Sequence, residues 1–199
     1  MTLLILWRHG QTEWNAAGRI QGQTDTPLSA VGVEQARESA PRVAALGPTA
    51  LVASDLTRAA TTAAALAEVS GLPVTHDPRL RERSFGQWES HTHAEVTQRW
   101  PESFARWRRG EEVGDAGVEE IDAVAKRMVA ALQEAVDTAA PDAVIVAATH
   151  GAAARFATIA LLGWPMDLAP TLGALHNCHA THLRHDPVRG WTLQAHNVS

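Results

Sequence analysis

The fold is decided by a stretch close to the start of the chain, Leu3-Leu-Ile-Leu-Trp7-Arg-His-Gly10. Its apolar part is a continuous run of strand length, the pattern of a strand that is buried on both faces of a sheet. The run ends where an arginine and a histidine appear, and the glycine after them allows the backbone to approach a ligand closely. The stretch therefore predicts a central strand whose carboxyl end carries binding or catalytic side chains.

Strands and helices are predicted to alternate along the rest of the chain. Short apolar runs indicate buried strands, and apolar residues that recur at helical spacing indicate helices between them. Either Ser54 or Asp55 is expected to cap a helix. This alternation implies right-handed crossovers and a largely parallel sheet with helices on both faces, so the predicted fold class is α/β with three layers, αβα. The further predicted strands lie at 50–52, near 74 and at 144–148, and the predicted helices at 29–46, 57–69, 118–136 and 152–162.

We expect a single domain over residues 1–199, because one core serves chains of up to about 250 residues. No linker divides the chain. The least regular stretch is 77–117, which is interrupted by prolines and glycines and has short helical pieces near 92–99 and 103–109. We interpret it as a cap or lid inserted in the domain.

Composition narrows the class of protein. The formal net charge is −5, and the basic residues are spread along the chain without a basic block, which argues against nucleic acid as a partner. The apolar run at the start is too short for a membrane span or for a signal peptide. The single cysteine, Cys178, can form no internal disulfide, as expected in a reducing compartment. We therefore expect a cytoplasmic protein with no membrane partner.

Three polar side chains are predicted to meet at one edge of the sheet. His9 follows the first strand, His150 follows the strand at 144–148, and Arg58 comes shortly after the strand at 50–52. In parallel sheets the carboxyl ends of the strands share one edge, and ligands bind there. We expect one pocket at this edge.

The motifs of the chain resemble those of the histidine phosphatase superfamily, the phosphoglycerate mutase-like proteins. The hallmark of that family is Arg-His-Gly after the first strand, here Arg8-His9-Gly10. The likeness extends over nearly the whole chain and implies the phosphoglycerate mutase-like fold. The other matching segments, in order, are Gly22-Gln-Thr-Asp25-Thr-Pro27-Leu28-Ser29, Ser54-Asp55-Leu56-Thr57-Arg58-Ala59, Leu80-Arg-Glu-Arg-Ser-Phe85-Gly-Gln-Trp-Glu89 and Thr149-His150-Gly151.

The resemblance implies a phosphatase that acts through a phosphohistidine and needs neither a metal nor a cofactor. His9 would be the nucleophile, and Glu82 would protonate the leaving oxygen. Arg8, Arg58 and His150 would hold the phosphoryl oxygens. Guanidinium forks suit a phosphomonoester, which carries nearly two negative charges at neutral pH. We expect the two arginines to keep His9 neutral, and burial beside the substrate to keep Glu82 protonated.

The substrate implied by the resemblance is a small phosphorylated metabolite, such as a sugar phosphate or a phosphoglycerate derivative. The family also leads us to expect a homodimer. Trp14 and Trp88 are candidates for the wall of the pocket. The further residues expected to bind substrate or phosphate are Asn15, Gln21, Gly22 and Gly151, with Arg83 and Phe85 on the leaving-group side.

Two other functions of the same fold stay open. A cofactor-dependent phosphoglycerate mutase uses the same side chains but returns the phosphoryl group to the bound product. The mutases have an asparagine where this chain has Ala152, and their paired arginines are matched only superficially by Arg108-Arg109. A non-catalytic regulatory protein would bind a phospholigand without turning it over, although all five polar side chains are retained.

Two rival sites are suggested by cysteine and histidine. Cys178 and Arg184 have the spacing of cysteine-dependent phosphatases, but the residues between them lack the glycine of a phosphate-binding loop. Histidines recur every three residues in a segment of strand-like composition, where they would alternate between the two faces instead of gathering around a metal. They are His176, His179, His182 and His185.

Overall fold

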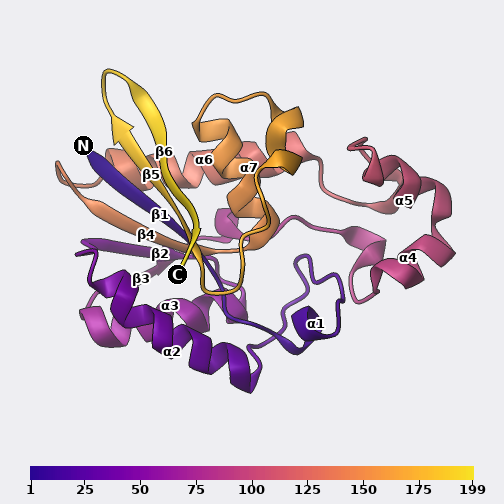
Figure 1. The fold of residues 1–199 in the computed structure, drawn as a ribbon, viewed down its shortest axis with the longest axis horizontal. Helices are drawn as coiled ribbons and strands as arrows, with labels where there is room; N and C mark the ends of the chain where they lie inside the picture. Colours follow the sequence, from indigo (N-terminus) through magenta and orange to yellow (C-terminus); the bar gives the residue numbers. More distant parts are fainter.

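The computed structural model describes residues 1–199 and contains one six-stranded sheet in the order β3-β2-β4-β1-β5-β6 (Figure 1). The pairings of β1 with β4, β4 with β2 and β2 with β3 are parallel. The pairings of β1 with β5 and of β5 with β6 are antiparallel. The predicted largely parallel sheet is confirmed, with an antiparallel hairpin at one edge. The strands are β1 (Thr2–Arg8), β2 (Ala50–Ala53), β3 (Val74–His76), β4 (Val144–Thr149), β5 (Ala180–Asp186) and β6 (Gly190–Val198).

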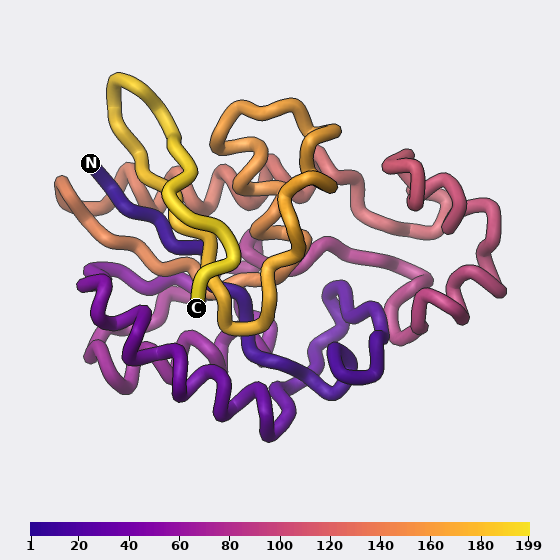
Figure 2. Tube along the Cα trace, in the orientation of Figure 1, coloured from indigo at the N-terminus to yellow at the C-terminus, as the bar shows by residue number.

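Helices cover both faces of this sheet, as predicted (Figures 1 and 2). Helices α2 and α3 pack together on one face, and α6 and α7 pack together on the other. No helix has both the length and the apolar character that crossing a membrane requires. The helices are α1 (Glu13–Ala16), α2 (Ala30–Ala44), α3 (Thr57–Ser70), α4 (His93–Arg99), α5 (Pro101–Arg108), α6 (Ile121–Asp137) and α7 (Gly151–Leu161).

Strand β1 is the centre of the molecule because it contributes to both cores. Leu4 and Leu6 belong to the core under α6 and α7, whereas Ile5 and Trp7 belong to the core under α2 and α3. All four side chains are 0% exposed. Alternation of side chains along a strand therefore places β1 between two apolar layers, as its sequence predicted.

The segment 77–117, which we call the cap, lies between β3 and α6 and contains α4 and α5. In Figure 1 these two helices stand apart from the sheet. The cap has its own small core, whose centre is the fully buried Trp88, packed edge-on against Phe104 and Trp107. The expectation that Trp88 walls the substrate pocket is wrong, because its indole fills the interior of the cap.

The sequence does not predict β5 and β6 as a hairpin of two strands. Polar side chains and histidines interrupt its apolar pattern, since β6 lies at the edge of the sheet. Only His182 and His185 lie in β5, whereas His176 and His179 precede it. The interpretation of all four histidines as residues of one strand is therefore wrong. No group of three or more His, Cys, Asp or Glu side chains is placed to hold a metal ion.

Glycines allow α2 to approach the loop that follows β1. A Cβ atom on Gly32 would lie 1.9 Å from the carbonyl oxygen of Gln11, and one on Gly10 would lie 2.4 Å from the carbonyl oxygen of Gly32. Both clashes involve backbone, which cannot swing aside as a side chain can. The position of the loop after Arg8 and His9 thus depends on the first turn of α2, which Ser29 caps by accepting a hydrogen bond from the Gly32 amide at 3.1 Å.

We predict that Gly32→Ala displaces this loop and destabilises the protein by about 1–3 kcal/mol, the usual cost of overpacking. For a domain of this size, each kcal/mol lowers Tm by about 2–4 °C. Thermal unfolding followed by circular dichroism measures the effect. The matched control is Gly173→Ala, because nothing lies within 4 Å of a Cβ at that position. Equal Tm values for the two variants would contradict the close approach.

Candidate active site

His9 lies directly after β1 with its imidazole almost completely buried, 2% exposed. Its Nδ1 is 2.6 Å from the carbonyl oxygen of Gly10, so Nδ1 carries the proton and donates it to that carbonyl. The amide of Gly10 donates in turn to Oγ1 of Thr62 on α3 at 3.1 Å. These bonds fix the ring and leave Nε2 with a free lone pair, which is what a nucleophile needs.

His9 lines a cavity of about 310 Å³, which we call the phosphate cavity. The cavity brings together the end of β1, the loop before α2, the start of α3 and the cap. Of the residues predicted for the site, Arg8, His9, Asn15, Gln21, Gly22, Arg58, Glu82 and Phe85 line it. The lining residues that the sequence did not point to are Gly18, Arg19, Ile20, His93 and Trp107.

Arg58 is the most firmly held side chain of the site and is 0% exposed. Its Nη2 donates to the carbonyl oxygen of Gly22 at 2.7 Å, and its Nη1 donates to that of Thr24 at 2.9 Å. Its Nε donates to Nδ1 of His150 at 3.3 Å. Further N–H groups of the guanidinium have no protein partner. Arg58 therefore binds the 22–24 loop and still presents donors and a positive charge to the cavity.

The start of α3, which carries Arg58, is capped from a distance. The expected caps Ser54 and Asp55 precede the true N-cap position, Leu56, whose side chain caps nothing. The carboxylate of Asp25 instead accepts hydrogen bonds from the amide of Thr57 at 2.8 Å and from its hydroxyl at 2.7 Å. The loop that Arg58 binds is thus joined to α3 by two side chains, Arg58 and Asp25.

Arg8 lies beside His9 at the end of β1. Its Nη1 donates to the carbonyl oxygen of Leu175, and its buried Nε has no hydrogen-bond partner. Gly151 lies behind it, because a Cβ at that position would be 3.6 Å from Nε of Arg8. Gly151 therefore packs next to Arg8 and does not line the phosphate cavity. A buried guanidinium with an unused N–H is suited to bind an anion.

His150 lies behind Arg58 and away from the cavity wall. Its Nδ1 accepts from Arg58, and its Nε2 lies 2.9 Å from Oγ of Ser54, so the proton of the neutral ring is on Nε2. The ring centroid is 5.1 Å from that of His9. Both nitrogens are engaged, so His150 supports Arg58 here. Its direct contact with a phosphoryl group stays a prediction.

Both histidines are held neutral. Burial lowers the pKa of His9 well below its ordinary value, and the positive charges of Arg8 and Arg58 lower it further, while the bond to Gly10 opposes the change. Burial likewise lowers the pKa of His150 well below its ordinary value, followed by the effects of Arg58 and His9. The burial of His9 and its two neighbouring arginines thus account for the neutral ring that the sequence led us to expect.

Glu82 lies at the amino end of α7. Its Oε1 accepts hydrogen bonds from the amides of Arg83 and Ala153, both at 2.8 Å, and its Oε2 accepts from the amide of Ala152 at 3.1 Å. The amides of Ala152 and Ala153 belong to the first turn of α7 and have no partner within the helix. The backbone of Glu82 is held from α6 by Arg127, whose Nη2 donates to its carbonyl oxygen at 2.9 Å. The carboxylate is therefore fixed at both of its oxygens.

The side-chain amides of Gln21 and Asn15 are held in place by hydrogen bonds to their oxygen atoms. Oε1 of Gln21 accepts from the hydroxyl of Thr12 at 2.9 Å and from that of Thr26 at 2.6 Å. Oδ1 of Asn15 accepts from the amide of Thr12 at 3.1 Å and from Nδ2 of Asn177 at 3.4 Å. The NH₂ ends of both side chains remain as donors, and both residues line the phosphate cavity.

Glu89 joins the two loops of the site, and sequence reasoning did not give it this role. Its carboxylate accepts from the amide of Gln23 at 3.1 Å and from the amide and hydroxyl of Thr24 at 3.0 and 2.6 Å. It also accepts from the amide of Phe85 at 3.0 Å. Gly22 has a φ of +54°, and a Cβ there would lie 2.0 Å from Oε1 of Glu89. Only glycine fits at this contact.

Arg83 lies outside the phosphate cavity. Its side chain is buried, donates from Nε to the carbonyl oxygen of Glu119 at 2.6 Å and pairs with Glu112 at 3.2 Å. It lines a neighbouring cavity instead, together with Phe85. Arg83 thus faces a separate hollow next to the site, whereas Phe85 lines both spaces, and contact of either residue with the leaving group stays a prediction.

Burial of Cys178 excludes it as the nucleophile of a cysteine-dependent phosphatase. Cys178 is 6% exposed, and burial raises the pKa of its thiol to about 11, so the thiolate that a nucleophilic cysteine requires does not form near neutral pH. Arg184 lies exposed on β5 and forms no phosphate-binding loop with it. The backbone of Cys178 does support the site, since its amide donates to the carbonyl oxygen of Arg8 at 3.1 Å.

The comparisons of this chain with known proteins agree on one family. The family model described as the histidine phosphatase superfamily (branch 1) matches residues 4–199. A glucosyl-3-phosphoglycerate phosphatase of Mycolicibacterium vanbaalenii is 40% identical, over 98% of this chain and 94% of the relative. A probable phosphoglycerate mutase of Yersinia pestis is 33% identical, over 98% of this chain and 92% of the relative. The solved structure of a mycobacterial glucosyl-3-phosphoglycerate phosphatase with VO3 has a TM-score of 0.91 and 36% identity, covering 99% of both chains.

These matches confirm the resemblance that the sequence motifs predicted, together with the phosphoglycerate mutase-like fold and the enzyme class, a phosphatase. They extend over both halves of the chain and therefore include every segment that lines the phosphate cavity. The chain belongs to the histidine phosphatase superfamily, branch 1.

Proposed function

We propose that the protein hydrolyses a small phosphorylated metabolite by transferring its phosphoryl group first to Nε2 of His9 and then to water. The observation that carries the proposal is the state of His9, a neutral ring with a bare Nε2 that lines a cavity between Arg8 and Arg58. A neutral nucleophile beside two cations is suited to attack an anionic phosphoester.

In the first step, Nε2 of His9 attacks phosphorus in line with the leaving oxygen. The N–P bond forms as the P–O bond breaks, and Glu82 delivers a proton to the leaving alkoxide. Arg8 and Arg58 hold the equatorial oxygens, and the NH₂ ends of Asn15 and Gln21 supply further donors. The positive charges that a metal would supply in other phosphatases come here from guanidinium groups.

The proton on Glu82 arrives with the substrate. Its carboxylate accepts three backbone N–H bonds, which hold both oxygens in place. A phosphomonoester has a second pKa of about 6, so its monoanion carries a proton that can move to the carboxylate when the two negative groups meet. In the second step, Glu82 takes a proton from water, which attacks phosphorus and releases inorganic phosphate and the free imidazole.

The proposed substrate is a phosphorylated glycerate that carries a sugar, the kind of compound that the names of the mycobacterial relatives describe. The relative from Yersinia supports phosphoglycerate mutase as the second candidate. Release of inorganic phosphate, set against interconversion of phosphoglycerates, separates the two. A cytoplasmic location, a homodimer and the absence of metal, cofactor and nucleic acid stay predictions from the sequence.

We predict that His9→Ala abolishes the phosphoenzyme, because the variant lacks the ring nitrogen that accepts the phosphoryl group in the proposed first step. Rapid acid-free quenching of enzyme mixed with radiolabelled substrate, followed by gel electrophoresis, measures the label. His176→Ala is the control, since this exposed histidine lies before β5, outside the cavity. Full labelling of the His9→Ala variant would overturn the assignment of the nucleophile.

For Glu82→Gln, we predict that kcat falls by about 10²–10⁴ on an alkyl phosphate, the usual contribution of a general acid. The loss on p-nitrophenyl phosphate should be much smaller in this first step, because nitrophenolate leaves without protonation. Burst kinetics isolate that step. Glu13→Gln, an exposed acid on α1, serves as the control. Equal losses on the two substrates would argue against proton delivery by Glu82.

The lowered pKa of His9 has a direct signature in its ¹⁵N spectrum. Below its ordinary pKa of about 6.5, a free histidine is protonated on both nitrogens, whereas His9 should stay neutral with the proton on Nδ1. Arg58→Gln removes one of the charges that lower this pKa, so protonation should begin at a higher pH. Arg37→Gln, an exposed arginine on α2, should change nothing. Titration of His9 near 6.5 in the unaltered protein would contradict the account.

A further inference from the structure

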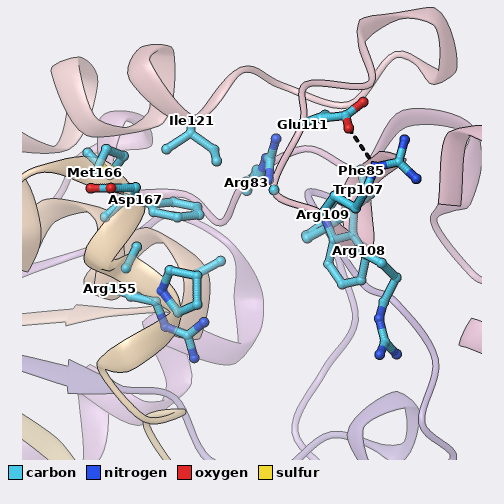
Figure 3. A pocket seen from close by; sticks show the side chains of 15 residues that line it. Arg83, Phe85, Trp107, Arg108, Arg109, Glu111, Ile121, Arg155, Met166 and Asp167 are labelled. Carbon is cyan, nitrogen blue, oxygen red and sulfur yellow. Dashed lines mark hydrogen bonds and ion pairs between the residues drawn. The ribbon is translucent and has the colours of Figure 1, made fainter. Parts of the chain in front are cut away.

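A second cavity of about 370 Å³ lies next to the phosphate cavity and shares Phe85 and Trp107 with it. Figure 3 shows Phe85, Trp107 and Arg108 of the cap on one side of this space and Arg155, Met166 and Asp167 on the other. We call it the leaving-group cavity. A molecule whose phosphate reaches His9 has this space beside it, because the two cavities meet at the same aromatic side chains.

The leaving-group cavity is rich in positive charge. Two of its four arginines have acidic partners: Arg83 pairs with Glu112 and Arg109 with Glu111. The other two, Arg108 and Arg155, have no acidic side chain within ion-pair distance and form no hydrogen bond within the protein. Arg108 is exposed, whereas Arg155 is partly buried. Arg155 is therefore the partly buried cation of this cavity that forms no ion pair.

Arg155 is built into the rim of the catalytic site. It lies on α7, three residues after Ala152, whose amide binds Glu82, so the two residues lie on neighbouring turns of one helix face. Its Nε is buried without any hydrogen-bond partner. Burial lowers the pKa of Arg155, and the only charge that opposes this is Glu82. Burying a charged donor without a partner is costly, which indicates that a ligand supplies the partner.

We infer that the leaving group of the substrate occupies this second cavity and that Arg155 binds a carboxylate on it. The inference rests on the proposed function and identifies how the substrate class is recognised. A planar guanidinium matches the two oxygens of a carboxylate. Arg155 lies one helical turn after the amides that bind Glu82, so a substrate whose leaving oxygen is next to Glu82 can place a neighbouring carboxylate next to Arg155.

The aromatic residues at the junction fit the remainder of such a substrate. Phe85 and Trp107 present flat apolar surfaces, on which the apolar face of a sugar ring can pack. A glycerate skeleton that carries phosphate, carboxylate and sugar on successive carbons would place one group on His9, one on Arg155 and one against these rings.

Two substrates that differ only at the carboxylate test the inference. 3-Phosphoglycerate carries it, whereas glycerol 3-phosphate has a hydroxymethyl group in its place. We predict that kcat/KM of the unaltered enzyme is at least about tenfold higher for 3-phosphoglycerate, since a site built to bind a polar group discriminates against an analogue without it. Arg155→Gln should lower this ratio about tenfold, and Arg155→Lys, which keeps the charge but not the fork, should lower it less.

Arg37→Gln is the control for charge, because it removes one positive charge from the exposed surface of α2 and should leave the ratio unchanged. A ratio near one in the unaltered enzyme, or an unchanged ratio in a folded Arg155→Gln variant, would overturn the inference while phosphoenzyme formation still supports the proposed function. If no phosphoenzyme forms, the inference about Arg155 is tested by binding alone, with calorimetry on the His9→Ala variant. That variant should bind 3-phosphoglycerate about tenfold more tightly than glycerol 3-phosphate and lose this preference with Arg155→Gln; equal affinities would overturn the inference.

Discussion

The whole site depends on placing two guanidinium groups beside a buried imidazole, where water screens them little. Arg58 is buried and Arg8 is half-buried next to His9, and burial of the ring together with these two charges keeps it neutral. The same charges attract the dianion that the neutral ring attacks. Binding of the substrate and activation of the nucleophile therefore have one electrostatic cause. A change that weakens substrate binding also weakens the activation of His9.

The guanidinium groups of the site need hydrogen-bond partners that are held in fixed positions. Arg58 is held by carbonyl oxygens of the 22–24 loop and by His150, and Glu89 holds that loop to the segment that carries Glu82. The strands of the sheet supply the positions, while loops distant in sequence supply the hydrogen bonds. The cap then closes the side of the site on which the leaving group is expected.

The sequence predicted the parts of this site that follow from strand ends. Arg8 and His9 come directly after one apolar run and Arg58 comes shortly after another, so the rule for parallel sheets brings them together without knowledge of side-chain contacts. Contacts between distant segments could not be predicted. The helix cap by Asp25, the place of Trp88 inside the cap and the leaving-group cavity between the cap and α7 all depend on packing that no local pattern encodes.

The arrangement of both guanidinium groups around a phosphoryl group on His9 can be observed in a crystal structure with vanadate, which takes the trigonal bipyramidal shape of a phosphoryl group in transfer. We predict vanadium bonded to Nε2 of His9 on one axis, with Arg8 and Arg58 on the equatorial oxygens and Glu82 facing the opposite axial oxygen. Vanadate bonded to another side chain, or held away from both guanidinium groups, would contradict this prediction.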